Sequence, residues 1–366
     1  MADQVSAIPR CRRVHGLWKI PTGIVGPSRR SSMRKILLSG MVVAVVVMAS
    51  GCGASPLAES GAAPRVAAIM TGEDTDNGFA QAGADAVKTL TAEGVVAGKT
   101  QDGVDVTKAK TYLRQYADSG VDLVIAWGLD LQESVREVAS EYPGTKFLGT
   151  GGEPDLRKAT ANVEMWTYDT GQFGYLLGYI AGLTQLSPVA IVDGPQEPFL
   201  ESQWHGFDQG LKAANPRVTL LSPIYTGDFN DPEKARQATQ QQVTAGARLI
   251  ASNAQGYAPG VAAAAHRAKI ATVGISKNAS AEAPAVNVAQ VKLDMVPIFR
   301  AVFARLKSGV FGNQGTTSTI ANRSLVVTDV NRVEAAPATP ADLVQQATGL
   351  ADRLASGQVN IVPWSR

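Results

Sequence analysis

The sequence predicts an α/β protein of two similar lobes, each a parallel sheet covered by helices on both faces. Near-continuous apolar, β-rich runs alternate with amphipathic helical stretches from residue 65 onward, which is the pattern of buried parallel strands. The alternation begins again near residue 188, after a long helical stretch. The chain has 366 residues, of which 45% are hydrophobic and 18% are charged, so we expect two globular domains with sizeable cores.

The first 52 residues have the layout of an export signal. A short basic segment at 33–35 precedes an apolar run at 36–49, and small residues at 49–51 lead to Cys52. The run is shorter than the ~20 residues that a membrane-spanning helix needs. We interpret 1–51 as a leader and lipoprotein signal peptide, in which Met33 is a better-placed start than Met1. Lipid on Cys52 would anchor the exported protein to the outer face of the cell membrane. The alternative is an uncleaved membrane anchor with a chance cysteine.

The exported part differs in charge from the whole chain. The net charge of the chain is +2, but residues 1–51 hold eight of its 34 basic and one of its 32 acidic residues, which leaves −5 from residue 52 on. This balance argues against nucleic acid as a partner, because clustered Lys and Arg supply most of that affinity. The two cysteines are Cys11, in the leader, and Cys52, so we expect neither a disulfide nor a cysteine-based metal site.

The elements follow in a regular order after a small, polar and Pro-bearing tether at 52–64. Strands are predicted at 65–71, 121–128, 146–150, 189–194, 218–225, 248–253 and 269–276. Helices are predicted at 77–90, 106–119, 131–141, 170–183, 200–214, 231–245 and 256–267. The helix from 231 has the clearest start, because 230–233 supply an N-cap, a Pro in the first turn and Glu233 for a capping box. The tail alternates like a β-hairpin at 317–334 and ends in a predicted helix at 340–355.

The order of these elements divides the body into two lobes. We assign 65–187 and roughly 275–315 to the first lobe, and 188–274 and roughly 316–366 to the second. When two open parallel sheets face each other, the carboxyl ends of their strands and the N-termini of the following helices meet along a shared crevice. We therefore expect the binding residues in the loops that follow the strands.

The loop after the first strand, MTGEDTDNGFAQAG at 70–83, is the first candidate wall of a ligand site. Asp76 offers hydrogen-bond acceptors, and Phe79 is a flat apolar face that could stack on a ring. In the competing interpretation an acid of this loop is an Asx-type N-cap and Phe79 packs into the core. The later loops add six candidates, although a Trp at a strand end can equally plug the core: Trp127, Asp130, Trp204, Asn253, Tyr257 and Ser276.

Enzyme motifs are not found. The sequence contains neither His-Glu-x-x-His nor Gly-x-Ser-x-Gly, and three histidines, one of them in the leader, make a His-based triad or metal site improbable. GVVAGKT at 94–100 is one residue too short for a phosphate loop. We therefore predict no catalytic residue, no metal and no cofactor.

Six blocks of sequence occur in a characteristic order and spacing. They are DNGFAQ at 76–81, VDLVIAWG with VREVASEYPGTKFLG at 121–149, YLLGYIAGL at 175–183, HGFDQGLKAANP at 205–216, YTGDFNDPEKARQATQQQVTAGARLI at 225–250 and ATVGIS at 271–276. Together they resemble the basic membrane protein (Bmp) family of bacterial lipoproteins over about 66–307. The resemblance implies the type I periplasmic-binding-protein fold, with two Rossmann-like lobes and a ligand cleft between them. Known members of the family capture purine nucleosides for an ABC transporter.

The site residues implied by the resemblance match only in part. The family's acidic and aromatic run matches at 76, 78, 79 and 81, but Ala80 replaces the Asn that contacts the base. Ala251 stands where a second aromatic would complete the base sandwich, and Ser276 stands where an Asp would grip the ribose. The family's next Lys has no firm match near 290–292. Losing a ring partner and a carboxylate costs several kcal/mol unless other groups replace them. Replacement ring faces could come from Trp127, Trp204 or Tyr257.

We therefore predict a lipid-anchored, extracytoplasmic solute-binding protein of an ABC importer. It would capture a small polar, ring-bearing and nucleoside-like solute by hinge closure and deliver it to a membrane permease. We expect a monomer. Two alternatives stay open: a ligand sensor that reports to a membrane receptor or regulator, and a nucleoside hydrolase that uses Asp74 and Asp76.

Overall fold

The computed structural model describes residues 62–253 and 255–365. The chain from Ser60 to Arg366 forms one compact unit. The predicted signal and Cys52 lie outside the described residues. Within the described residues, no helix has both the length and the hydropathy of a membrane span.

The first sheet has six parallel strands in the order β11-β5-β4-β3-β1-β2. They are β1 (Arg65–Met70), β2 (Ala97–Gln101), β3 (Leu123–Trp127), β4 (Lys146–Thr150), β5 (Val163–Tyr168) and β11 (Gly315–Ser318). Its helices are α1 (Phe79–Ala92), α2 (Ala109–Asp118), α3 (Gln132–Glu141) and α9 (Val296–Ser308), with short 3₁₀ turns η1 (Val106–Lys108) and η2 (Glu153–Lys158).

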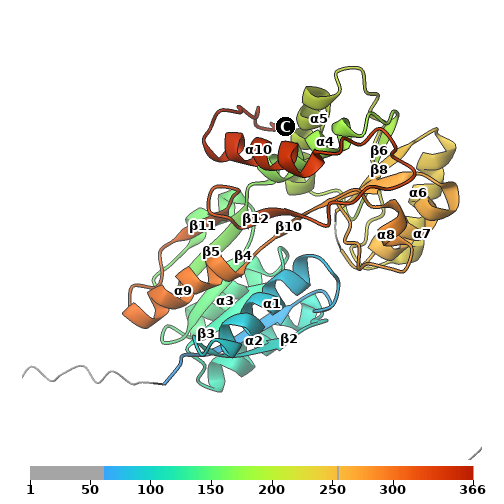
Figure 1. Ribbon diagram of the computed structural model, residues 1–366. Coiled ribbons are helices and arrows are strands. Elements are labelled where there is room, and N and C mark those ends of the chain that lie inside the picture. Colours follow the sequence, from blue (N-terminus) through green and yellow to red (C-terminus); the bar gives the residue numbers. More distant parts are fainter. Residues whose placement is uncertain (1–61, 254, 366) are drawn as a thin grey trace, which may run out of the picture. The chain divides into compact units, whose positions relative to one another are not determined.

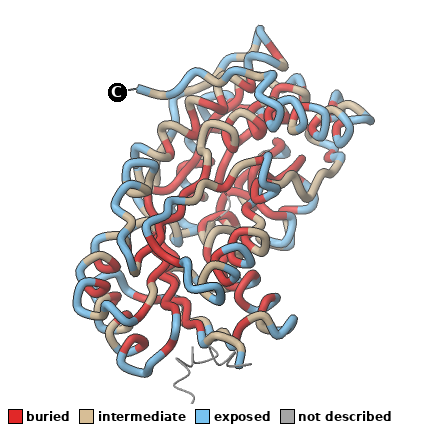
Figure 2. Tube along the Cα trace, turned by 90° about the vertical axis from the view of Figure 1, so that its left-hand side faces the viewer, coloured by how far each residue is buried: buried red, intermediate tan, exposed pale blue. Residues whose placement is uncertain are grey.

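Both faces of this sheet are covered, as its sequence predicts. Every residue of β3 is buried, and successive side chains enter different hydrophobic clusters. Leu123, Ile125 and Trp127 belong to one cluster, while Val124 and Ala126 belong to the other. This two-residue period places a core on each face of the sheet. Figure 2 shows the result as buried strands inside a layer of exposed helix faces and loops.

The second sheet has four parallel strands in the order β7-β6-β8-β9. They are β6 (Val189–Asp193), β7 (Ile224–Tyr225), β8 (Leu249–Ala251) and β9 (Ala271–Val273). The remaining helices are α4 (Thr170–Leu183), α5 (Pro198–Ala214), α6 (Pro232–Thr244), α7 (Ala258–Ala268), α8 (Ala283–Val286) and α10 (Leu343–Ala355). The predicted α/β class with two parallel sheets is confirmed (Figure 1).

A small third sheet joins the two larger ones. It consists of β10 (Gln290–Leu293) and β12 (Leu325–Thr328), which pair antiparallel. In Figure 1 these orange and red strands run between the two larger sheets. The predicted hairpin at 317–334 is wrong, because β11 pairs parallel with β5 and β12 pairs with β10 instead. The predicted division of the chain into two lobes, with boundaries at 187, 275 and 315, stays a prediction. In the structure, β11 is part of the first sheet, and α4 packs along α5.

Glycines explain why α4 and α5 pack so closely. A Cβ atom on Gly174 would lie 1.8 Å from the carbonyl oxygen of Gln203, and one on Gly178 would lie 2.0 Å from that of Phe207. From the other helix, a Cβ atom on Gly210 would lie 2.0 Å from the carbonyl oxygen of Tyr175. The two backbones therefore touch at positions where any side chain would collide. This contact accounts for the glycine spacing in YLLGYIAGL and HGFDQGL.

Candidate ligand-binding site

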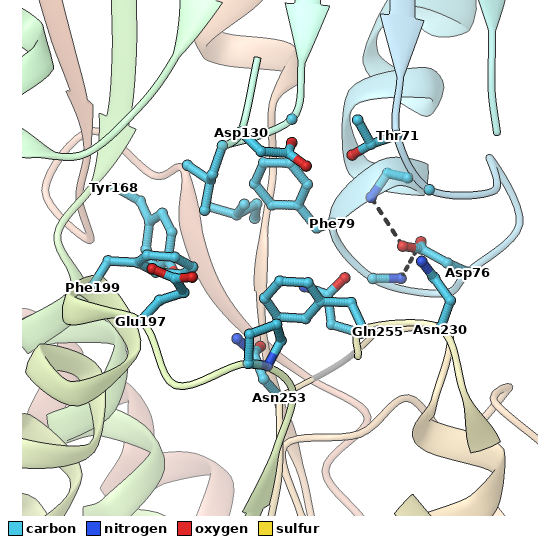
Figure 3. A pocket seen from close by; sticks show the side chains of 18 of the residues that line it. Thr71, Asp76, Phe79, Asp130, Tyr168, Glu197, Phe199, Asn230, Asn253 and Gln255 are labelled. Carbon is cyan, nitrogen blue, oxygen red and sulfur yellow. Dashed lines mark hydrogen bonds between the residues drawn. The ribbon is translucent and has the colours of Figure 1, made fainter. Parts of the chain in front are cut away.

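A cavity of about 900 Å³ lies where loops from both large sheets meet. Its walls come from the loops after β1 and β3, from β10, and from the segments that lead into α5, α6 and α7. Figure 3 shows labelled side chains from these segments around the cavity. The parallel strands explain this location, because their carboxyl ends share one edge of each sheet.

The loop after β1 is shaped by Asp76. Its carboxylate accepts hydrogen bonds from the backbone N–H groups of Gly78 at 2.8 Å, Ala80 at 3.0 Å and Gln81 at 3.0 Å. Burial raises the pKa of Asp76, and these three backbone donors oppose that rise. Asp76 lines the cavity, and its carboxylate also secures the first turn of α1, as in the competing Asx-type interpretation.

Phe79 follows at the first position of α1 and lines the cavity half-buried. Its ring stacks on that of Trp127, with centroids 4.7 Å apart and planes inclined by 14°. Trp127 is fully buried at the end of β3, and its Nε1 donates a hydrogen bond of 2.7 Å to the carbonyl oxygen of Phe79. Trp127 thus lies behind Phe79 and does not line the cavity. It fixes the plane of the Phe79 ring at the cavity wall.

On the side of the second sheet, a buried carboxylate gathers several predicted site residues. Asp193, at the end of β6, accepts hydrogen bonds from the Tyr257 hydroxyl at 2.7 Å, from Trp204 Nε1 at 2.6 Å and from the backbone of Gly194 at 2.8 Å. Burial raises the pKa of Asp193 to about 6. Trp204 and Tyr257 are also buried and do not line the cavity. Their polar atoms bind Asp193, so these rings support the wall from behind.

A second buried group reaches the cavity surface. The Tyr168 hydroxyl donates to Gln203 Oε1 at 3.2 Å, and Asn253 Nδ2 donates to the same oxygen at 3.5 Å. Tyr168 and Asn253 both line the cavity. Gln203 thus orients the side chains of both Tyr168 and Asn253 at the cavity wall.

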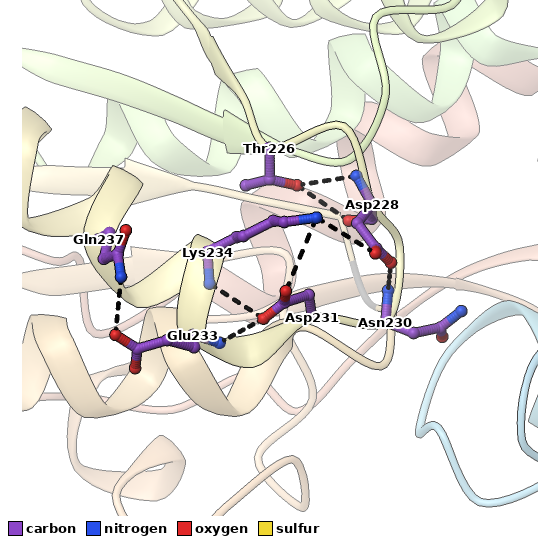
Figure 4. Close-up of polar contacts among 7 residues, drawn as sticks. All are labelled: Thr226, Asp228, Asn230, Asp231, Glu233, Lys234 and Gln237. Atoms are coloured by element: carbon purple, nitrogen blue, oxygen red, sulfur yellow. Dashed lines mark hydrogen bonds and ion pairs between the residues drawn. The ribbon is translucent and has the colours of Figure 1, made fainter.

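Hydrogen bonds and ion pairs hold the loop between β7 and α6, as Figure 4 shows. Asp231 caps α6 by accepting from the N–H groups of Glu233 at 2.9 Å and Lys234 at 3.1 Å. The expected capping box does not form, because the N-cap is Asp231 and Glu233 is therefore not the third residue of the helix. The Glu233 carboxylate binds Arg236 and Gln237 instead. Asp228 Oδ1 accepts from the backbone of Asn230 at 2.8 Å. This framework presents Phe229 and Asn230, both of which line the cavity.

Ser276 lies away from the cavity lining. Its hydroxyl is 3.3 Å from Asp329 Oδ2, and the backbone N–H of Lys277 donates to the same oxygen at 3.0 Å. The Asp329 carboxylate also lies 3.4 Å from Lys277 Nζ. Ser276 thus helps to hold the segment after β12 against the loop after β9.

The cavity therefore brings together four of the eight predicted ligand-binding residues, Asp76, Phe79, Asp130 and Asn253. Four aromatic residues that line the cavity were not predicted from the sequence: Tyr168, Phe173, Phe199 and Phe229. Tyr168 is the last residue of β5, which was not predicted as a strand. Phe199 is the second residue of α5, and Phe229 lies three residues before α6, so aromatic residues at helix starts are the signal that points to them.

Two parallel α/β sheets joined by crossing strands, with a cavity where their loops meet, define the periplasmic-binding-protein fold. The chain belongs to the Bmp family, described as ABC transporter substrate-binding protein PnrA-like, whose sequence pattern matches residues 63–291. The resemblance drawn from the sequence is thus confirmed.

The chain is also similar to solved structures and to one curated protein. The chain is similar to an ABC transporter system solute-binding protein from Conexibacter woesei DSM 14684, with 35% identity, a TM-score of 0.72 and coverage of 82% of this chain and 99% of that one. A solute-binding protein from Aeropyrum pernix K1 shares the fold, with 18% identity, a TM-score of 0.69 and coverage of 83% and 94%. Basic membrane protein D from Borreliella burgdorferi (strain JD1) is 25% identical over 195 residues, which are 51% of this chain and 55% of that protein. The match thus spans about half the length of that relative.

Proposed function

We propose that this protein is the extracytoplasmic solute-binding component of an ABC importer and that it captures a ring-bearing, nucleoside-like solute. Membership of the Bmp family supports the transport role. The observation that carries the ligand class is the pair of aromatic walls. Phe79, backed by Trp127, faces the cavity from the first sheet, while Phe199 and Phe229 line it from the second. Aromatic faces on two walls suit a flat ring.

Polar side chains around these rings can orient a bound solute. Asn230, Asn253 and Gln255 line the cavity on the side of the second sheet. Side-chain amides carry both donors and acceptors, and can therefore bind hydroxyl or ring-nitrogen groups. Asn253 and its neighbours replace, in this proposal, the base and ribose contacts that are missing at 80, 251 and 276.

The alternative of a nucleoside hydrolase finds less support in the geometry. The Asp74 carboxylate lies 2.7 Å from Lys88 Nζ, and the Asp76 carboxylate accepts three backbone N–H groups. A general base needs a free acceptor within reach of its proton. Both candidate carboxylates already have partners.

Ligand binding tests the proposed site through Phe79. Binding of a panel of nucleosides and bases should be measured by isothermal titration calorimetry. For the solute that binds, Phe79→Ala should weaken binding by about 5- to 30-fold, because a stacked ring contributes about 1–2 kcal/mol. Tyr112→Ala is the matched control, because Tyr112 is a half-buried aromatic that does not line the cavity. Equal affinities of the Phe79→Ala variant and the unchanged protein would exclude this wall as the ring site.

Anchoring at Cys52 belongs to the same proposal, together with a permease as partner and a monomeric state. Cys52→Ser should move the protein from the membrane fraction to the aqueous fraction in cells. If the variant stays with the membrane as firmly as before, the lipid anchor is wrong.

A further inference from the structure

The cavity has an unbalanced charge. Among the described residues that line it, six side chains are carboxylic acids and one, Lys292, is a base. The acids are Asp76, Asp105, Asp130, Asp155, Glu197 and Asp228. A cleft lined by charge of one sign, with walls of low dielectric constant, concentrates ions of the opposite sign.

Four of the six carboxylates have partners within the protein. Asp76 binds backbone N–H groups of α1, and Asp105 caps η1 through Thr107 at 2.8 Å. Asp155 lies 2.6 Å from Lys158 Nζ, and Asp228 lies 3.5 Å from Lys234 Nζ. These contacts give the four acids structural roles.

The other two carboxylates, Asp130 and Glu197, have no Lys, Arg or His partner within the described part of the chain. Asp130 follows β3, on the same side of the cavity as Phe79. Glu197 precedes α5, two residues before Phe199. Figure 3 shows both acids among the side chains around the cavity. Each side of the cavity therefore combines an aromatic ring with a carboxylate that lacks a cation.

We propose that the preferred solute is a ring-bearing organic cation, bound between the aromatic walls with its positive charge facing Asp130 and Glu197. This inference rests on the proposed function and names the charge of its ligand. A cation is attracted to the faces of aromatic rings as well as to carboxylates. Asp130 and Glu197 are exposed to solvent in the structure. Closing the cavity on a neutral solute would remove water from both carboxylates without supplying a cation, and an anion would add repulsion.

The test compares probes that differ mainly in charge. 1-Methyladenosine carries a positive ring at neutral pH, and adenosine is its neutral counterpart. Tryptamine is a cationic amine, and tryptophol has a neutral hydroxyl in the same place. Affinities for the full chain in detergent should be measured by calorimetry at low and at moderate salt. In at least one pair, the cation should bind at least tenfold more tightly than its neutral partner, and salt should reduce this advantage.

Variants connect the preference to the two carboxylates. In the Asp130→Asn, Glu197→Gln double variant the ratio of the cationic to the neutral affinity should fall close to one. Glu334→Gln removes an exposed acid that does not line the cavity and should leave the ratio unchanged.

The possible failures are distinguishable. If a neutral probe binds as tightly as its cationic partner in both pairs, or if the double variant keeps the ratio, the charge inference is overturned and the ring-binding function stands. If none of the four probes binds, the inference and the proposed ring-binding function both fail.

Discussion

Asp193 shows how one residue organises a wall of the cavity from behind. It holds the side chains of Trp204 and Tyr257 through hydrogen bonds of 2.6 and 2.7 Å. Tyr257 stands next to the helix start of α7, and Trp204 lies on α5. A buried carboxylate with three donors therefore links β6 to two helices that border the site. Because such a group is costly to ionise in the interior, its contribution to stability depends on pH.

The pH dependence of unfolding should report this group. The pKa of Asp193 is raised by burial from 3.8 in the unfolded chain to about 6 in the folded protein. A raised carboxyl pKa stabilises the folded state fully below pH 3.8, and this stabilisation is lost as pH rises through about 6. The loss amounts to roughly 3 kcal/mol at most, at about 1.4 kcal/mol for each pKa unit.

Asp193→Asn should remove this dependence. Denaturant unfolding of both proteins at pH 4.5 and 7.5 measures it, and the variant should gain stability relative to the unchanged protein at the higher pH. The acceptor that the amide lacks adds a penalty that is independent of pH. Asp342→Asn, at an exposed position, serves as the control. Parallel pH profiles for the Asp193→Asn variant and the unchanged protein would contradict the buried-carboxylate explanation.

At the scale of elements, an ion pair ties α9 to the first sheet. Glu164 on β5 is fully buried, and its carboxylate accepts from Arg305 Nε at 3.0 Å and from the backbone of Gly312 at 3.1 Å. Arg305 lies on α9 and is itself largely buried. Another pair on the same helix, Arg300 with Glu93, is largely exposed. The helix thus carries a buried and an exposed pair of the same chemistry.

These two pairs should differ greatly in their effect on stability. Arg305→Leu leaves a buried carboxylate without its cation and should lower the free energy of unfolding by about 3–5 kcal/mol. Arg300→Leu disrupts an exposed pair and should change it by about 1 kcal/mol or less. Both variants are compared by urea denaturation. Similar losses in the two variants would mean that burial does not decide the strength of the Glu164 contact.

The elements also show what local sequence can predict. Six of the seven predicted strands coincide with β1, β3, β4, β6, β8 and β9, where apolar runs are bounded by turn residues. The strands β2, β5 and β10 were missed. AGKTQ and QVKL each carry a Lys and few apolar residues, whereas VEMWTY in β5 has the β-rich composition of a strand. The predicted hairpin failed for a different reason. The alternation at 317–334 correctly indicates extended chain, but local pattern does not say which strand is the partner.

At the scale of the whole molecule, the segments that connect the two large sheets determine how the two sides of the cavity can move. β10 and β12 form one such connection, and the short link at Asp169 between β5 and α4 forms another. The connecting strands also contribute to the cavity, since all four residues of β10 line it. Few residues would have to change conformation for the two sides to approach each other, as the predicted hinge closure requires.

Closure on the ligand is the prediction at this scale. Small-angle X-ray scattering should give a smaller radius of gyration with the bound solute than without it, because both walls must contact the ring at once. The Phe79→Ala variant should show a smaller change at the same solute concentration. A radius that stays constant at saturating solute would mean that the solute binds without closure.

The sequence by itself determined the α/β class, the parallel sheets, the edge at which loops gather and the family. These properties depend on the local period of apolar residues and on the order of motifs, both of which are written in consecutive residues. Only the tertiary structure decided which side chains reach the cavity. Trp127, Trp204 and Tyr257 stand at the predicted places along the chain, yet Phe79 covers the first and Asp193 binds the other two. The reason is that side-chain direction depends on packing between distant segments, which no local pattern contains.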